Sequence, residues 1–283
     1  MNRLEANEFS LWSGYVYATT RITLDSSKGY LIETRLAFLM RETGSNSYKE
    51  LLDKVTADST GALKRKVIGA ITTNETSFFR DTSPFEMLRH KILPDLVDAR
   101  RRRLGKDGAV TLRIWSAACS TGQEVYTTAI VCRETLPDAS KFDIRILGTD
   151  ISDKVIAQAS YGKYTKLEID RGLLPAQVSK YFQPDGGDYK VRDQMRSMAT
   201  FRTINLLEPL VFPTKFDIIF CRNVAIYFSD GDRRKLYDGI SRVLAPDGCL
   251  IIGSTESLTG ITSRLESKRH LRSVFYQLTP GAG

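Results

Sequence analysis

The sequence WSAACSTGQEVY, residues 115–126, decides the fold of this chain. An apolar run leads into it over residues 110–115 and is typical of a short buried strand. Apolar residues from 125 to 131 begin a helical pattern, and the turn between, residues 116–122, contains only small residues. A strand, a small-residue turn and a helix form the unit that holds a nucleotide-like ligand at the carboxyl end of a parallel sheet.

This turn carries no phosphate-binding signature. It lacks both the G-x-G-x-x-G pattern and the G-K-[ST] sequence. Glu124, in the first turn of the helix, would repel an anion at the place where a pyrophosphate usually binds. The ligand should therefore carry positive or neutral polar groups, and S-adenosylmethionine fits, with its sulfonium, its amino group and its two ribose hydroxyls. A turn that only packs strand against helix is the alternative.

The composition is that of an ordinary soluble globular protein, with 42% hydrophobic and 26% charged residues. At 283 residues the chain is long enough for one large domain or two smaller ones. Its formal net charge of +8 favours an acidic partner, but does not choose between nucleic acid, membrane surface and acidic protein. With no signal peptide and no apolar run of membrane-spanning length, we expect a cytoplasmic protein without membrane insertion.

The cysteines and histidines argue against two kinds of site. The four cysteines form no CxxC pair and have no metal-binding spacing, which predicts free thiols in a reducing compartment. His90 and His270 are the only histidines, and neither lies among other polar candidates. We therefore expect neither a histidine-based catalytic triad nor a metal site.

The first third of the chain is helical in pattern. Residues 1–90 show helical periodicity and almost no alternation of period two, which predicts a small all-helical N-terminal domain. Within it, Ile32, Leu36 and Leu39 share one helix face, and Gly44 can end that helix.

Each of two groups of basic residues allows a structural and a functional interpretation. On the second predicted helix, Lys28 and Arg35 lie away from the apolar face, and Arg41 flanks it. They form either a solvated face or a surface that docks an acidic helix. The arginine run at residues 100–103 is either a nucleic-acid contact or the solvated end of a helix, and the absence of interleaved aromatic residues favours the second reading.

From residue 108 onward, strand and helix patterns alternate, which predicts an α/β domain over 108–283, joined to the first domain by a linker helix over 91–107. The second strand, DIRILGTD, ends in Asp150. An aspartate at this place hydrogen-bonds a ribose diol in nucleotide-binding sheets. A helix N-cap is the alternative role, for which Ser152 competes equally well.

A later buried strand leads to a second polar group. The strand FDIIFC, residues 216–221, is followed by Arg222 and Asn223 and then by Tyr227. Polar residues at the end of the fourth strand should lie beside the reacting end of the ligand. Residues 274–278, VFYQL, predict an antiparallel strand at the edge of the sheet.

Between these strands the alternation of strand and helix is interrupted. The runs FQPDGGDYKV and MATFRTI, within residues 182–204, alternate around a Gly-Gly turn. They predict an antiparallel hairpin, and hence an inserted subdomain over about 180–203. Asn205 and Leu206 follow, placed like strand-end residues that contact a base.

A third informative segment precedes the linker helix. Residues 72–80, TTNETSFFR, place Asn74, Thr76 and Arg80 beside two phenylalanines. The phenylalanines fit a core or a ligand cover, and the three polar residues could be plain capping groups.

Six motifs, in order, resemble those of the CheR-type chemotaxis receptor methyltransferases. The resemblance covers nearly the whole chain. The motifs are TTNETSFFR, WSAACSTGQEVYTTA, LGTDIS, INLLE, FCRNVAIYF and APDGCLIIGSTES. The resemblance implies a small all-helical N-terminal domain and a doubly wound, mostly parallel class I methyltransferase sheet with an inserted antiparallel β-subdomain.

The resemblance also implies roles for individual residues. Arg80 and Tyr227 stand at the catalytic positions proposed for the family. Gln123 and Val125 replace the Glu and Pro that are common beside Glu124, and neither change removes a carried-over group. The residues implied to bind S-adenosylmethionine, or its product S-adenosylhomocysteine, are Asn74, Thr76, Arg80, Glu124, Asp150, Asn205, Leu206, Arg222 and Asn223.

The activity implied is methylation of glutamate side chains on the cytoplasmic helices of chemoreceptors. Lys28, Arg35 and Arg41 would then dock those acidic helices. Some members also tether to a peptide at the receptor C-terminus and have a longer loop in the inserted subdomain. Here the turn DGGD at 185–188 is short, so we expect no peptide tether. We also expect a monomer that binds no nucleic acid.

Two other functions compete with this one. A nucleic-acid methyltransferase is suggested by the +8 charge, but the segment RNVAIYF, residues 222–228, lacks the [DN]-P-P-[YF] motif of many amine methyltransferases. A catalytically silent cofactor sensor of the same fold is the other alternative, and the presence of Arg80 and Tyr227 disfavours it.

Overall fold

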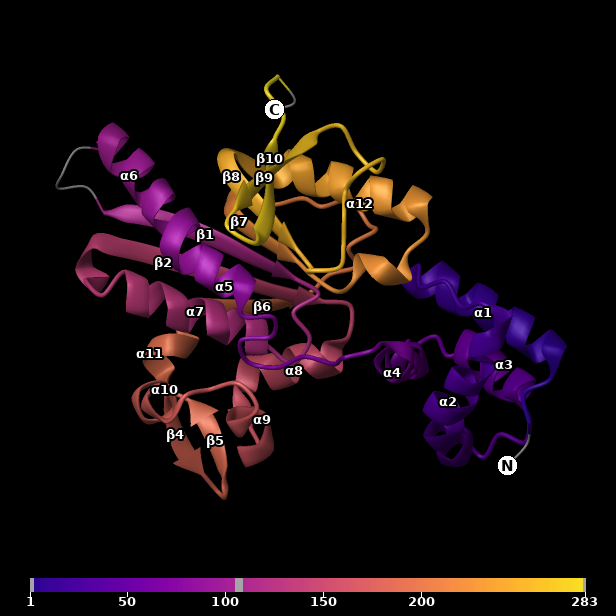
Figure 1. The fold of residues 1–283 in the computed structure, drawn as a ribbon. Coiled ribbons are helices and arrows are strands. Elements are labelled where there is room, and N and C mark those ends of the chain that lie inside the picture. Colours follow the sequence, from indigo (N-terminus) through magenta and orange to yellow (C-terminus); the bar gives the residue numbers. More distant parts are fainter. Residues whose placement is uncertain (1–2, 105–108, 282–283) are drawn as a thin grey trace.

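The computed structural model describes residues 3–104 and 109–281, and its first helices form a bundle with its own core (Figure 1). The helices predicted in this part are confirmed, and Gly44 ends α2 in the left-handed conformation, with φ 61°. Trp12, Ile32 and Leu36 are fully buried between the helices. The elements are α1 (Ala6–Thr20), η1 (Ser26–Lys28), α2 (Gly29–Thr43), α3 (Tyr48–Ala57) and α4 (Ala62–Ile71).

A seven-stranded sheet forms the centre of the rest of the chain, with strand order β6-β2-β1-β7-β8-β10-β9. The five strands from β6 to β8 run parallel to one another, and β10 pairs antiparallel with β8 on one side and with β9 on the other. The predicted doubly wound, mostly parallel sheet is thus confirmed. The strands are β1 (Val110–Ala117), β2 (Phe142–Asp150), β6 (Ala199–Thr203), β7 (Phe216–Cys221), β8 (Leu244–Ile252), β9 (Leu265–His270) and β10 (Ser273–Leu278).

One strand of the main sheet was missing from the sequence prediction. The run at 274–278 was expected at the edge of the sheet, but β10 pairs on both sides, and β9 occupies the edge. Four of the six residues of β9 are Glu, Lys, Arg and His, and only Leu265 is buried. An exposed edge strand of this composition carries little alternation of apolar and polar residues, so its sequence gave no strand signal.

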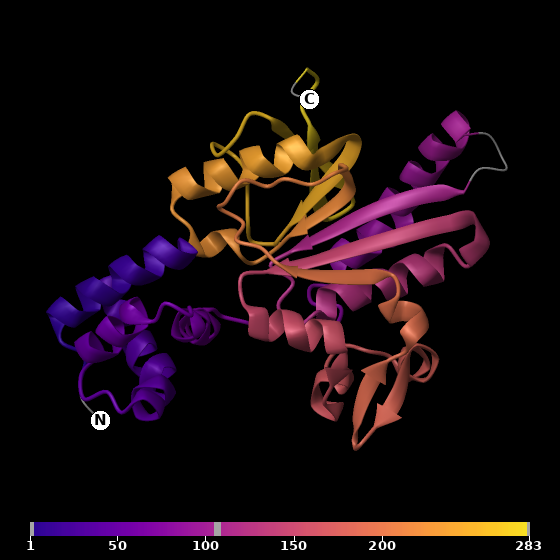
Figure 2. The same cartoon turned by 180° about the vertical axis from the view of Figure 1, so that it is seen from behind.

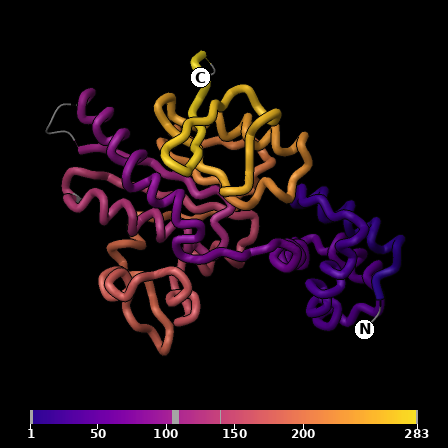
Figure 3. Tube along the Cα trace, in the orientation of Figure 1, coloured from indigo at the N-terminus to yellow at the C-terminus, as the bar shows by residue number. Residues whose placement is uncertain are grey.

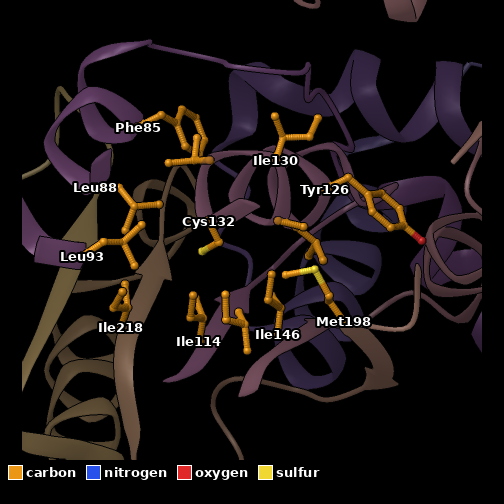
Figure 4. Packing of buried hydrophobic residues seen from close by; sticks show 14 of the residues in the cluster. Phe85, Leu88, Leu93, Ile114, Tyr126, Ile130, Cys132, Ile146, Met198 and Ile218 are labelled. Carbon is orange, nitrogen blue, oxygen red and sulfur yellow. The ribbon is translucent and has the colours of Figure 1, made fainter. Parts of the chain in front are cut away.

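Successive residues of the central strands face opposite layers of helix. Ile114 and Ile218 pack with α6 (Leu93–Leu104) and α7 (Gln123–Thr135), whereas Trp115 and Ile219 pack with α12 (Asp230–Val243). Figure 4 shows the first of these layers, with Leu93 of the linker helix facing the strand residues. Because successive side chains point to opposite faces and both faces are covered by helices, most residues of these strands are buried. The strands therefore appear in the sequence as continuous apolar runs.

The linker helix begins earlier than predicted. Helix α5 (Ser83–Met87) continues through a π-helical turn, η2 (Leu88–Ile92), into α6 without a break. Phe85 and Leu88 are buried in the core of the sheet rather than in that of the N-terminal bundle. The boundary at residue 90 is therefore wrong, and the chain crosses between the two cores in residues 72–80, as the trace in Figure 3 shows.

The inserted β-sheet is confirmed in kind, and its bounds are corrected. Strands β4 (Phe182–Asp185) and β5 (Asp188–Val191) form the hairpin, and both turn glycines have positive φ, 60° at Gly186 and 87° at Gly187. The third strand is β3 (Lys163–Tyr164). The run MATFRTI does not belong to this sheet, because β6 pairs with β2 in the main sheet.

Four short helices lie around the inserted sheet, and the first of them, α8, contacts α4 of the N-terminal bundle (Figures 1 and 2). They are α8 (Asp153–Tyr161), α9 (Lys166–Asp170), α10 (Pro175–Tyr181) and α11 (Asp193–Arg196). Two 3-10 turns, η3 (Ala139–Lys141) and η4 (Ala225–Tyr227), complete the elements. In the part of the chain that the structure describes, no helix has both the length and the apolar character needed to cross a membrane.

Candidate functional site

One cavity lies where the carboxyl ends of β1, β2 and β7 meet residues 72–80, and it encloses about 940 Å³ of space that opens to solvent. This is the switch point at which doubly wound sheets bind ligands. The structure brings the predicted cofactor and catalytic residues together in its wall: Asn74, Thr76, Arg80, Glu124, Asp150, Asn205, Leu206, Arg222, Asn223 and Tyr227.

Backbone strain is concentrated around this cavity. Seven residues other than glycine have positive φ among those described, and five of them lie in three segments of the methyltransferase domain at the cavity wall, residues 79–81, 118–120 and 222–224. Such conformations cost about 1–3 kcal/mol each and persist where the surrounding structure enforces them, most often at functional sites. The five are Phe79, Asp81, Ala118, Ser120 and Asn223.

The motif turn of residues 116–122 is tightly packed from outside. Gly122 has φ 94°, and a Cβ there would lie 2.9 Å from Ala159 Cβ. Tyr164 of the inserted sheet donates a hydrogen bond of 2.7 Å to the Thr121 carbonyl. The inserted subdomain thus supports the turn that forms the floor of the cavity.

Asp150 is buried at the end of β2, and its carboxylate accepts hydrogen bonds from the backbone N–H groups of Ser120 (3.0 Å) and Ser152 (3.1 Å). Burial raises the pKa of Asp150, because desolvation outweighs these backbone hydrogen bonds. Ser152 is the N-cap residue of α8, but its hydroxyl makes no capping hydrogen bond. Asp150 therefore fixes the motif turn and still presents carboxylate to the cavity.

Glu124 and Arg222 form a buried ion pair. Glu124 accepts from the Ser116 hydroxyl at 2.7 Å and from Arg222 Nη1 at 2.8 Å. Arg222 Nη2 donates to the Arg80 carbonyl at 2.9 Å and to Asp81 Oδ2 at 3.0 Å. The guanidinium therefore links the motif helix to the linker segment, a connection that the sequence did not predict.

Arg80 and Tyr227 present free functional groups to the cavity. The Arg80 guanidinium donates one hydrogen bond of 2.7 Å to the Glu75 carbonyl, and among the described residues no carboxylate pairs with it. The Tyr227 hydroxyl has no hydrogen-bond partner in the described part of the chain. An unpaired cation and an unoccupied hydroxyl in one cavity are groups that a charged substrate can use.

The remaining predicted residues are held mainly through their backbones. The Ser120 hydroxyl donates to the Asn74 carbonyl at 2.9 Å. Asn205 accepts from the Leu207 N–H at 3.1 Å through its side-chain oxygen. The Asn223 N–H donates to Glu256 Oε2 at 2.7 Å.

Among the residues of this region that the sequence interpretation missed, Thr20, Ile22 and Glu256 are informative. Thr20 and Ile22, from the end of α1 and the segment after it, line the cavity. Nothing in their sequence pointed to this role, because the approach of the two domains is a tertiary feature. Glu256 was detectable, since it lies in the quoted motif APDGCLIIGSTES. Burial raises its pKa, and its buried Oε1 has no hydrogen-bond partner among the described residues.

The basic residues predicted to dock a substrate have different environments. Lys28 lies in η1, before α2 rather than on it, and its ammonium pairs with Asp25 at 3.2 Å. Arg35 donates to the Ile71 carbonyl and, at 2.9 Å, to the Thr73 hydroxyl, so it ties α2 to the linker. Arg41 is exposed at the end of α2. Arg35 therefore does not belong to a solvated face of α2.

Two arginines of the run in α6 form ion pairs within the protein. Arg100 pairs with the buried Asp217 and, at 3.1 Å, with Asp247. Arg103 also pairs with Asp247. These contacts bind α6 to the strand ends opposite the cavity, which favours a structural reading of the run over a nucleic-acid contact.

Comparison with known proteins identifies the family. The model of the CheR methyltransferase all-alpha domain matches residues 7–72, and that of the CheR methyltransferase S-adenosylmethionine-binding domain matches residues 74–273. This chain belongs to the CheR methyltransferase family.

Curated relatives match the CheR chain over nearly its whole length. It is 37% identical to chemotaxis protein methyltransferase 1 of Pseudomonas aeruginosa over 274 residues, and the alignment covers 95% of this chain and 97% of the relative. It is also 37% identical over 279 residues to the chemotaxis protein methyltransferase of Vibrio parahaemolyticus, with 96% of each chain covered. The family resemblance inferred from the six motifs is confirmed, and the protein is an S-adenosylmethionine-dependent methyltransferase of the chemotaxis family.

Proposed function

We propose that this protein transfers methyl groups from S-adenosylmethionine to glutamate side chains on the cytoplasmic helices of methyl-accepting chemotaxis receptors. The observation that carries the proposal is that two side chains with available polar groups line one cavity: the Arg80 guanidinium, which no carboxylate of the described chain neutralises, and the Tyr227 hydroxyl, which has no hydrogen-bond partner among the described residues. Acidic residues also line this cavity, Asp150 and Glu124 among them, and its turn carries no phosphate-binding motif.

The residues present fit S-adenosylmethionine. Asp150 would accept hydrogen bonds from the ribose diol, and Glu124 would face the cationic methionine end of the cofactor. The adenine side would be formed by Asn205 and Leu206, and the remaining contacts by Asn74, Thr76, Arg222 and Asn223.

A glutamate acceptor explains the absence of a catalytic base among the predicted groups. Its carboxylate is already ionised at neutral pH, with a reference pKa of about 4.3, so no proton must be removed before it attacks. The cofactor supplies a methyl group activated by the sulfonium. Arg80 would hold the carboxylate by a charge-assisted hydrogen bond, and the Tyr227 hydroxyl would orient it. Positioning of this kind can supply ~7–11 kcal/mol of the barrier.

The substrate side of the proposal rests on charge. Receptor helices rich in glutamate would be attracted by the net charge of +8, and Lys28 and Arg41 would contact them directly. Arg35 would act indirectly, by holding α2 against the linker. We propose that the protein does this as a cytoplasmic monomer.

Transfer of labelled methyl to purified receptor cytoplasmic fragments, with RNA and DNA as competing acceptors, tests the proposal. We expect label only in the receptor fragment, released by mild alkali as methanol because a carboxylate methyl ester hydrolyses readily. Tyr227→Phe should lower the rate at saturating cofactor, whereas Phe38→Tyr, an exposed site on α2, should not. Labelled nucleic acid, or label in receptor that resists alkali, would contradict the proposal.

A further inference from the structure

The end of helix α1 is bonded directly to the loop that carries Tyr227. The Tyr17 hydroxyl donates to Asp232 Oδ2 at 2.9 Å, and the Thr23 N–H donates to the Tyr227 carbonyl at 3.1 Å. Figures 1 and 2 both show the end of α1 meeting the start of α12. The N-terminal bundle is therefore attached to the catalytic loop, in addition to its connection through residues 72–80.

Asp232 is the centre of this contact. It is buried in the first turn of α12, where Ser229 is the N-cap residue. The Ser229 hydroxyl donates to Asp232 Oδ2 at 2.8 Å and accepts from the Asp232 N–H at 3.2 Å. One carboxylate oxygen thus accepts from both Ser229 and Tyr17, and Ser229 is only two residues from Tyr227. The hydrogen bond from Tyr17 therefore acts on the segment that positions the catalytic tyrosine.

The segment after Tyr17 also covers the cavity. Helix α1 ends at Arg21, which has left-handed φ 62° and donates its N–H to the Tyr17 carbonyl at 2.9 Å. The Arg21 guanidinium lies 5.3 Å from the centre of the Tyr17 ring and holds the ring in place. This turn directs the chain back toward the sheet, so that Thr20 and Ile22 line the cavity opposite the motif turn.

We propose that Tyr17 is a positioning residue and that residues 17–23 form a clasp, which closes the cofactor cavity and holds Tyr227 in place for methyl transfer. The proposal rests on the proposed function, because it assumes that the cofactor occupies this cavity. Release of the product cofactor then requires the clasp to part from Asp232 and Tyr227. The helical bundle thereby controls cofactor exchange as well as substrate docking.

Tyr17→Phe tests the clasp, because it removes only the hydroxyl. We expect the dissociation rate of S-adenosylhomocysteine, measured by stopped-flow fluorescence, to rise by about fivefold, in line with the loss of one hydrogen bond. The turnover number should fall, while the Michaelis constant for receptor and the melting temperature should stay close to those of the wild type. Tyr15→Phe is the matched control: Tyr15 lies on the same helix, and its hydroxyl has no partner among the described residues.

A double-mutant cycle with Asp232→Ala, which removes the acceptor of the Tyr17 hydrogen bond, separates the clasp from a general loss of stability. If the two groups act through one hydrogen bond, the double variant should release the product hardly faster than the faster single variant. Wild-type dissociation and turnover in Tyr17→Phe, with normal binding of S-adenosylhomocysteine by the wild type, would overturn the clasp alone. Failure of the wild type to bind S-adenosylhomocysteine would overturn the proposed function and the clasp together.

Discussion

Arg222 Nη1 lies 2.8 Å from Glu124 Oε2, and the two side chains are 2% and 13% exposed. The same guanidinium binds the carbonyl of Arg80 and the carboxylate of Asp81. It therefore fixes the linker at the residue whose own guanidinium faces the cavity. The buried charge of Arg222 holds the backbone of Arg80, the arginine we propose to be catalytic, while the charge of Arg80 stays available.

Replacing Arg222 by methionine should destabilise the protein and weaken cofactor binding. The change leaves two carboxylates, those of Glu124 and Asp81, without their cation, and breaking a buried ion pair costs about 3–5 kcal/mol. The lower end is expected, since Asp81 is 38% exposed and can be hydrated. The free energy of unfolding in urea and the affinity for S-adenosylhomocysteine measure the two effects.

Arg65→Met is the control for that change. Arg65 pairs with Asp153 at 3.9 Å, and both side chains are more than half exposed. Pairs of this kind contribute about 0–1 kcal/mol. If both methionine variants lose the same small amount of stability, the bridge through Arg222 does not hold the linker.

Cofactor affinity should fall in mild acid. Burial raises the pKa of Asp150 above its ordinary value of 3.8, and in the proposed site the ribose diol would require the ionised carboxylate as an acceptor. Affinity is therefore complete above this raised pKa and is lost as pH falls through it. Calorimetry with S-adenosylhomocysteine, from neutral pH downward, should show the loss. Asp150→Asn cannot titrate and should bind weakly throughout, which separates Asp150 from Glu256, whose pKa is also raised.

The arginine run of α6 should matter for stability and not for methyl transfer. Arg100→Ala leaves the carboxylate of Asp217 buried with only the Arg113 N–H as a partner, so we expect a loss of about 2–3 kcal/mol in the free energy of unfolding. Arg102→Ala, which has no ion pair in the described chain, should be neutral. Salt-sensitive RNA binding by the wild type that Arg102→Ala weakens would contradict this interpretation and support the nucleic-acid alternative.

Receptor docking should depend on exposed charge. Arg41→Glu and Lys28→Glu should raise the Michaelis constant for receptor without changing cofactor affinity, and the effect should shrink with salt because charges are screened over ~8–10 Å. Arg35→Glu should also lower stability, because it breaks two hydrogen bonds to the linker. Arg102→Glu is a control of equal charge change at the opposite end of the sheet. Equal effects of Arg41→Glu and Arg102→Glu would show that only net charge matters.

The parts of the fold that the sequence predicted are those in which local pattern and burial agree. The strand at 216–221 is apolar throughout because both of its faces are covered. The run MATFRTI was assigned to the wrong sheet, because its alternation shows that one face is buried but does not identify the partner strand. Edge strand β9 was missed for the opposite reason, since its residues are mostly charged.

The residues of the site also divide into those that local sequence pattern predicts and those that depend on tertiary contacts. Glu124 in the first turn of α7 and Asp150 at the end of β2 follow from the order of strand, turn and helix. Their partners do not, because Arg222 is 98 residues from Glu124 in sequence and meets it only in the folded chain. The contribution of α1 to the cavity likewise depends on the docking of two cores, for which no local pattern exists.

The edge of the inserted sheet is poorly suited to an added strand. Strand β4 is paired only with β5, so its outer edge is free. In a hairpin closed by two residues, the flanking pair Asp185–Asp188 is hydrogen-bonded, so Pro184 and Phe182 direct their backbone groups outward. Pro184 has no N–H, and the Phe182 N–H is already bonded to the Val178 carbonyl at the end of α10. The other edge, β3, has only two residues.

We therefore predict that the inserted sheet does not bind a peptide from the receptor C-terminus. Recognition by strand addition requires main-chain donors along the edge, and β4 offers none at its outward positions. Titration of the protein with receptor C-terminal peptides should show no saturable binding, and receptors that lack this peptide should be methylated as fast as intact ones. Pro184→Ala restores one outward N–H and is the variant most able to gain weak binding. Micromolar binding by the wild type that maps to Phe182–Asp185 would show that the edge accepts a strand despite Pro184.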